Sequence, residues 1–114
     1  MTLLVDAGPL VTLADPSEPQ RDAILNILTT ETGALALPAP TTGEVDYLLG
    51  RRFGPPARRA FLSDLAAGRF SVAGLERADY ATIVDLDARY ADLELGLADC
   101  AAVVLAARYG PLAS

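Results

Sequence analysis

The chain has 114 residues, of which 52% are hydrophobic and 21% are charged, a balance that indicates one globular domain and excludes a disordered chain. Fifteen acidic residues face nine basic ones, and the net charge of −6 argues against nonspecific binding of nucleic acid over the whole surface. The sequence has no histidine and a single cysteine, Cys100, which excludes a Cys/His zinc site and an internal disulfide, so any metal or acid–base chemistry must rest on carboxylates.

The chain opens with a short apolar run, Leu3–Val5, that leads directly into Asp6. Such a run predicts a buried strand of a parallel sheet, and ligands of open α/β sheets collect at the carboxyl ends of these strands. Gly8 and Pro9 favour an immediate turn into a helix. Asp6 is therefore a candidate for two roles, the N-terminal cap of that helix and a functional carboxylate.

Strands and helices alternate along the rest of the chain. Short apolar runs predict strands at 34–38 and 70–73. Apolar residues at helical spacing, with Pro and Gly near the ends, predict helices at 19–30, 39–50, 55–67, 77–90 and 97–109. The last of these helices is apolar along most of its length, so it is predicted to be buried on most sides. This order implies a parallel sheet covered by helices on both faces.

The C-terminal end departs from this alternation. Gly110 and Pro111 predict a helix stop, and the residues left after it are too few for the strand that should follow. We therefore expect one domain, 1–114, with its last strand truncated or not included. No apolar run approaches the roughly 20 residues of a membrane span, and the N-terminus lacks a secretory pattern, so the protein is predicted to be cytoplasmic, with no membrane partner.

Three acidic residues occupy positions unlike the other acids. Asp6 ends the first strand, Glu44 lies in the first turns of the helix after the second strand, and Asp99 lies in the first turn of the last helix. In a parallel sheet these positions share one edge, so the three carboxylates are predicted to converge. Converging like charges call for a cation such as Mg²⁺ or Mn²⁺, which lowers the pKa of bound water and holds a phosphoryl oxygen. The alternative is structural, because the helix dipole favours acids in a first turn.

The residues around these acids resemble those of the PIN-domain family, and more narrowly the VapC-type toxins of bacterial toxin–antitoxin pairs. The resemblance rests on Leu-Val-Asp at 4–6, Thr-Thr-Gly-Glu-Val-Asp-Tyr-Leu-Leu-Gly-Arg-Arg at 41–52 and Gly-Leu-Ala-Asp-Cys-Ala-Ala-Val-Val-Leu-Ala at 96–106. It implies a three-layer α/β/α sandwich with a central parallel sheet. It also implies a metal-dependent endoribonuclease whose Asp6, Glu44 and Asp99 hold Mg²⁺ or Mn²⁺ and carry catalysis. A homodimer, a tRNA or rRNA substrate and a small neutralising antitoxin protein follow from the same resemblance.

Two departures from the family pattern keep an alternative open. The family commonly has a hydroxyl residue directly after the first Asp, where this chain has Ala7, and a fourth acid beyond the last helix, which this chain lacks. The alternative is a catalytically weak or inert PIN-like module that binds antitoxin or RNA. A phosphate-handling domain of the response-regulator type would need a lysine at a strand end, and the chain has no lysine.

One dense basic cluster lies between the second and third predicted strands. It comprises Arg51, Arg52, Arg58 and Arg59. These side chains are candidates for holding RNA phosphates or an acidic segment of the antitoxin. The competing interpretation is a solvated cluster at a helix end, where the helix dipole favours cations.

Overall fold

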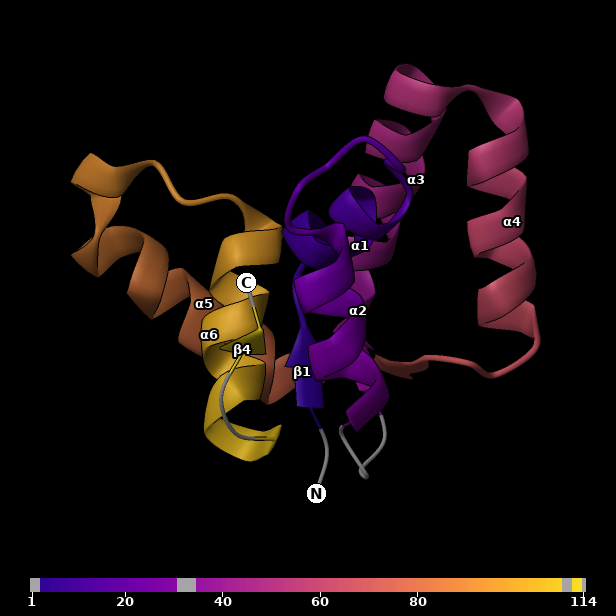
Figure 1. Ribbon diagram of the computed structural model, residues 1–114. Coiled ribbons are helices and arrows are strands. Elements are labelled where there is room, and N and C mark those ends of the chain that lie inside the picture. The colour runs from indigo at the N-terminus through magenta and orange to yellow at the C-terminus, as the bar shows by residue number, and fades with distance from the viewer. Residues whose placement is uncertain (1–2, 31–34, 110–111, 114) are drawn as a thin grey trace.

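The protein is described here from a computed structural model, which covers residues 3–30, 35–109 and 112–113. Four strands form one sheet: β1 (Leu3–Val5), β2 (Leu35–Pro38), β3 (Ser71–Ala73) and β4 (Leu112–Ala113). The helices are α1 (Ala7–Leu13), α2 (Arg21–Thr30), α3 (Ala39–Phe53), α4 (Pro55–Ala66), α5 (Arg77–Arg89), the 3₁₀ turn η1 (Ala91–Leu93) and α6 (Leu97–Tyr109). In Figure 1, α5 and α6 lie to the left of β1, and α3 and α4 lie to its right.

The sheet has the strand order β3-β2-β1-β4, and every pairing in it is parallel. Side chains of β1 alternate between its two faces, as the period of a strand requires. Val5 packs with Leu37 and with α1, α3 and α4 on one face. Leu4 packs with Leu105 of α6 on the other face. Helices therefore cover both faces of a parallel sheet, which confirms the predicted fold class.

A last strand is present, so the prediction that it is not included in the chain is wrong. Leu112 and Ala113 form β4, which pairs in parallel with Leu4 and Val5 of β1. The sequence argument failed because two residues after the helix stop suffice to pair with a central strand that is itself three residues long. The predicted starts and stops at 32–34 and 110–111 lie outside the described residues.

Helix α6 is less enclosed than its composition suggested. Cys100, Ala101 and Leu105 are buried, as the prediction requires. Val103 and Leu97, however, are 54% and 49% exposed. The helix packs against β1, β2, α3 and α5, and its side at Val103 stays open, so the prediction that it is buried on most sides is confirmed only in part. Its apolar sequence instead leaves uncovered hydrophobic surface beside Asp99.

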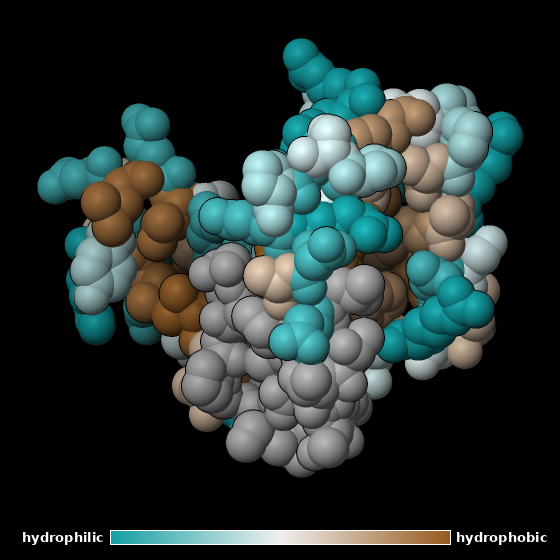
Figure 2. Space-filling view, viewed as in Figure 1, coloured by the Kyte–Doolittle hydropathy of each residue, from teal (hydrophilic) through white to brown (hydrophobic). Residues whose placement is uncertain are grey.

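Further apolar side chains are exposed on α5 and η1. Tyr80 is 49% exposed, Val84 67% and Leu93 63%. Apolar side chains gather on the left of the molecule in Figure 2, where Figure 1 shows α5. Exposed apolar patches of this kind mark sites of association in soluble proteins. No helix in the described part of the chain is both long and apolar enough to cross a membrane.

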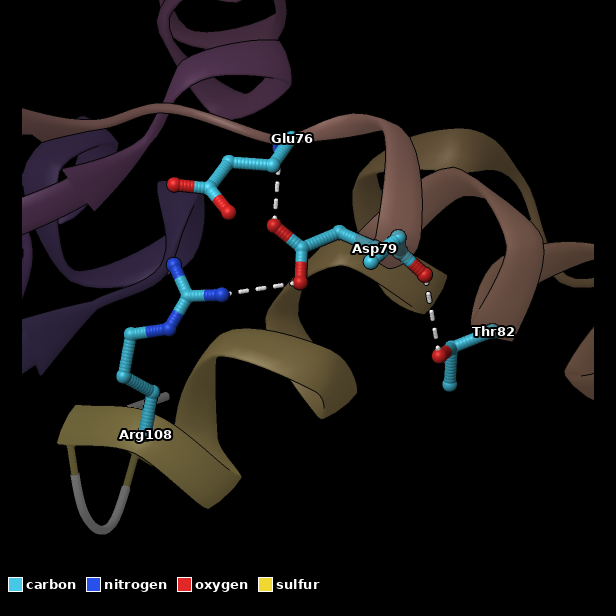
Figure 3. Close-up of polar contacts among 5 residues, drawn as sticks. Glu76, Asp79, Thr82 and Arg108 are labelled. Carbon is cyan, nitrogen blue, oxygen red and sulfur yellow. Dashed lines mark hydrogen bonds and ion pairs between the residues drawn. The ribbon is translucent and has the colours of Figure 1, made fainter.

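A buried acid joins the start of α5 to the end of α6. The Asp79 side chain is 8% exposed, and its Oδ1 lies 2.9 Å from the Arg108 guanidinium. Its Oδ2 accepts a hydrogen bond of 2.8 Å from the backbone N–H of Glu76 (Figure 3). The backbone hydrogen bond from Glu76, followed by the bond and charge of Arg108, lowers the pKa of Asp79. The ionised carboxylate therefore both caps α5 and clamps it to α6.

Asp79→Asn is expected to lower the melting temperature at neutral pH. A carboxyl whose pKa is lowered by folding stabilises the protein fully above its ordinary value of 3.8, and this contribution disappears as the pH falls through the lowered pKa. The difference between wild type and variant should therefore shrink in acid, as measured by circular dichroism melts across pH. Asp85→Asn, an exposed change on the same helix, is the control. A difference in melting temperature that stays constant across pH would contradict a stabilising role for the Asp79 charge.

Candidate functional site

Asp6 lies where β1 passes into α1, at the carboxyl edge of the sheet. Its backbone is extended, with φ −89° and ψ 172°, and its Oδ1 accepts a 2.8 Å hydrogen bond from the N–H of Ala7. The predicted capping role is thus confirmed. The cap fixes the carboxylate at the edge where ligands of parallel sheets bind, so the two roles proposed for Asp6 are compatible.

Glu44 and Asp99 reach the same edge from helices that begin there. Glu44 follows the first turn of α3, which starts directly after β2, and its side chain is exposed. Asp99 lies in the first turn of α6, and its Oδ2 is 3.4 Å from the N–H of Gly96. The position of Asp99 agrees with the preference of acids for the first turn of a helix, whereas Glu44 lies beyond that turn. The topology therefore places all three acids at one end of the sheet.

The three carboxylates influence one another electrostatically. The pKa of Glu44 is raised, first by partial burial and then by the negative charges of Asp6 and Asp99. Like charges disfavour ionisation of a neighbouring acid, so the raised pKa of Glu44 places the three side chains in one electrostatic environment. Converging carboxylates are the oxygen donor set that hard divalent cations prefer.

The carboxylates do not, however, close around a common point. Among the described residues, no three Asp, Glu, His or Cys side chains lie close enough together to form a metal-binding group. The Glu44 side chain is exposed, so it is the member of the three that has room to move. The residues therefore fit a divalent ion in type and in edge position, and binding would require their side chains to move together.

A pocket of about 520 Å³ opens beside two of these acids. Asp6 and Asp99 form its polar part. Its remaining lining is apolar and comes from Leu95 and from successive turns of α6, namely Ala102, Val103 and Ala106. A second pocket of about 360 Å³, lined mainly by apolar side chains of α1, α3 and α4, lies among residues that include none of the three acids.

Glu44→Gln is expected to raise the melting temperature of the metal-free protein at neutral pH. Folding raises the pKa of Glu44, so its charged form destabilises the folded state at pH values above the ordinary 4.5, and this penalty vanishes below it. The gain should be modest, because the side chain is exposed, and it should disappear in acid. Melts in EDTA from pH 3 to pH 8 measure this, and a variant less stable than wild type at pH 7 would contradict the shared environment.

The four arginines of the basic cluster differ in their contacts. Arg58 Nε lies 2.8 Å from Asp46 Oδ1, which joins α4 to α3. Its stem crosses Gly50, where a Cβ would lie only 3.3 Å from Arg58 Cδ, so glycine provides the space for this crossing. Arg58 therefore holds the α3–α4 hairpin together. Sequence reasoning missed this role because the partner, Asp46, lies on a different helix.

The other arginines remain at the surface. Arg51 donates a 2.8 Å hydrogen bond to the hydroxyl of Tyr47, and the Arg52 guanidinium lies 5.4 Å from the centre of the Phe53 ring. Arg59 is exposed. These contacts hold Arg51 and Arg52 at the end of α3 but leave both exposed to a ligand.

One buried polar residue near the acids was also missed. Thr41, in the first turn of α3, is completely buried, and its hydroxyl has no hydrogen-bond partner within the described part of the chain. An unsatisfied buried hydroxyl costs about 1–3 kcal/mol, so such groups are exceptions that call for an explanation. Its place four residues before the apolar Val45 was the available signal that it faces the interior.

Both the sequence and the fold have relatives among known proteins. The family model of the PIN domain matches residues 3–111. Ribonuclease VapC26 of Mycobacterium tuberculosis is 32% identical over 107 residues, covering 94% of this chain and 79% of that protein. The crystal structure of M. tuberculosis VapC20, titled a sarcin–ricin loop cleaving toxin, has a TM-score of 0.83 at 16% identity and covers 95% of this chain and 83% of its own. VapBC2 from Rickettsia felis, bound to a DNA fragment from its promoter, has a TM-score of 0.71 at 14% identity, with coverage of 100% and 86%.

Proposed function

Because the chain belongs to the PIN-domain family, we propose that it is a metal-dependent endoribonuclease and the toxin of a toxin–antitoxin pair. The observation that carries this proposal is the placement of Asp6, Glu44 and Asp99 at one edge of the sheet, where Asp6 and Asp99 line the same pocket. The 32% identity to a ribonuclease supports RNA as the substrate class.

Asp6, Glu44 and Asp99 would hold the divalent ion, Mg²⁺ or Mn²⁺. Such an ion, when bound, supplies Lewis acidity toward a phosphodiester and an activated water. Asp6 contributes a carboxylate already oriented by the Ala7 N–H, and Asp99 contributes one fixed near the start of α6. Glu44 is the exposed member, and it would complete the set by turning toward the other two.

The exposed arginines of the α3–α4 corner are proposed to bind RNA phosphates or an acidic segment of the antitoxin. Arg51→Ala combined with Arg52→Ala is expected to weaken this binding and to reduce the slope of log affinity against log salt, by about 0.7 for each phosphate of single-stranded RNA that the variant no longer neutralises. Fluorescence anisotropy with a labelled tRNA or with the antitoxin, at salt concentrations from about 50 to about 300 mM, measures the slope. Arg77→Ala, an exposed change at the start of α5, is the control. An unchanged slope would show that Arg51 and Arg52 are surface charges that bind neither RNA phosphates nor the antitoxin.

We also propose an antitoxin partner, a homodimer and action in the cytoplasm, where the RNA substrate lies. The Rickettsia felis complex supports the antitoxin by its likeness in fold. The exposed apolar side chains of α5 and η1, with Val84 67% and Leu93 63% exposed, supply surface for association. Light scattering of the purified chain measures its oligomeric state directly.

Cleavage of a total tRNA pool and of purified ribosomal RNA tests the proposed activity. The purified, antitoxin-free protein is incubated with Mg²⁺, with Mn²⁺ or with EDTA, beside Asp99→Asn and the matched surface control Asp85→Asn. We expect cleavage that requires metal, is lost in Asp99→Asn and is unchanged in Asp85→Asn. Cleavage that persists in EDTA or in Asp99→Asn would contradict the assignment of the site.

The second candidate is a catalytically weak or inert PIN-like module that binds antitoxin or RNA. The separation of the three carboxylates favours this candidate, because no three acids among the described residues lie close enough together to bind a metal. A folded protein that binds RNA or antitoxin but cleaves nothing with either metal would support this candidate over the nuclease.

A further inference from the structure

The hydroxyl groups of Thr41 and its neighbour Thr42 differ in their hydrogen bonding. The Thr42 hydroxyl donates a 2.7 Å hydrogen bond to the carbonyl of Ala39, as threonines near helix starts commonly do. The Thr41 side chain is fully buried, and within the described residues its hydroxyl has no partner. Two adjacent threonines on one helix therefore have different roles, and only that of Thr41 lacks a local explanation.

The position of Thr41 on α3 shows which part of the protein it faces. Thr41, Val45 and Leu49 lie four residues apart, so they share one face of the helix. Val45 and Leu49 pack in the core that also contains Val5 of β1 and Ala7 of α1. Thr41 is the member of this row nearest the carboxyl edge of the sheet. At that edge, the polar side chain between Val5 and Ala7 is that of Asp6.

Asp6 is the acid of this edge whose carboxylate a further hydroxyl donor could support. Its Oδ1 accepts from the Ala7 N–H, and Ala7 itself brings no side-chain donor. A carboxylate that binds a metal is usually held by further hydrogen bonds, which fix its orientation and raise its affinity for the ion. The Thr41 hydroxyl is a donor and the Asp6 carboxylate is an acceptor, and the two residues lie at the starts of α3 and α1, two helices that contact each other.

We propose that Thr41 is a positioning residue for the acid site, whose hydroxyl donates a hydrogen bond to the Asp6 carboxylate when a divalent cation draws the three acids together. This inference rests on the proposed function. It assigns Thr41 no contact with the ion or the RNA. On this proposal the hydroxyl bonds to Asp6 only when the cation is bound, so its removal should affect metal binding and not folding.

Calorimetric titration with Mn²⁺, combined with melting curves in EDTA, tests this. We expect Thr41→Val to melt in EDTA at or above the wild-type temperature, because the variant loses only an unpartnered hydroxyl and keeps the same shape. Its affinity for Mn²⁺ should fall about 10–100-fold, as for other groups that support a metal ligand. Thr41→Ser should restore the affinity to within a few-fold of wild type. Thr42→Val, at the neighbouring position, is the matched control and should bind Mn²⁺ as wild type does.

The outcomes separate this inference from the proposed function. Wild-type affinity for Mn²⁺ in Thr41→Val would overturn the inference and leave the nuclease proposal standing. A Thr41→Val protein that melts well below wild type in EDTA would also overturn it, since the hydroxyl would then be bonded without metal. A wild-type chain that binds no Mn²⁺ and cleaves no RNA would overturn the proposed function and this inference with it.

Discussion

Asp6→Asn is expected to lower metal-dependent RNA cleavage by about 10²–10³-fold, the loss typical of removing one group that stabilises charge in a transition state. The change removes a negative charge from the proposed metal site but keeps an oxygen at the position that accepts the Ala7 N–H. Asn caps helices about as well as Asp does, so the fold should be preserved. The loss should appear in kcat/KM measured at saturating Mn²⁺.

Asp6→Ala separates the two roles of this residue. It should lose cleavage to the same degree as Asp6→Asn and, in addition, about 1 kcal/mol of stability because the α1 cap is removed. Denaturant unfolding of both variants in EDTA measures the second effect. Asp6→Asn with wild-type cleavage would exclude Asp6 as a ligand, while equal stability of the two variants would show that the cap contributes little.

Leu105→Ala is expected to destabilise the protein by about 2–5 kcal/mol, the range for truncating a buried leucine. Leu105 is completely buried and packs against Leu4 of β1 and Ala36 of β2, so it fastens α6 to the sheet. Because α6 carries Asp99, the variant should also cleave RNA less well at temperatures where wild type is fully active. Urea unfolding followed by circular dichroism measures the loss of stability.

Val103→Ala is the matched control for this prediction. Val103 lies on the same helix but is 54% exposed, and truncations at such positions usually change stability by no more than about 0.5 kcal/mol. Equal destabilisation by the two variants would contradict the burial described for α6. A change in cleavage by Val103→Ala without a change in stability would instead point to the pocket that Val103 lines beside Asp6 and Asp99.

The order of elements could be predicted from the sequence because each has a local signal. The apolar run Leu3–Val5, and the two prolines that begin α4, carry their structure within a few residues. The last strand could not be predicted in this way. Leu112 and Ala113 are ordered by the backbone of β1, at the opposite end of the sequence, and no local pattern reports such a partner.

In the candidate site, likewise, the positions of the acids could be predicted and the side-chain contacts could not. The positions of Asp6, Glu44 and Asp99 follow from topology, since each lies where a strand ends or a helix begins. Their exact spacing depends on side-chain rotation and mutual repulsion, which the sequence does not encode locally. The ion pairs Arg58–Asp46 and Asp79–Arg108 were missed because each of them joins two different helices.

The pairing of β1 with both β2 and β4 has a consequence for how the protein is made. A chain leaving the ribosome presents its N-terminal part first. Strand β1 can pair with β2 early, but Leu4 meets Leu112 only after the chain has emerged as far as residue 112. The helix that carries Asp99 is synthesised just before that point. The nascent chain therefore places its three acids at one edge only after α6 has been synthesised, which postpones any activity of that edge until then.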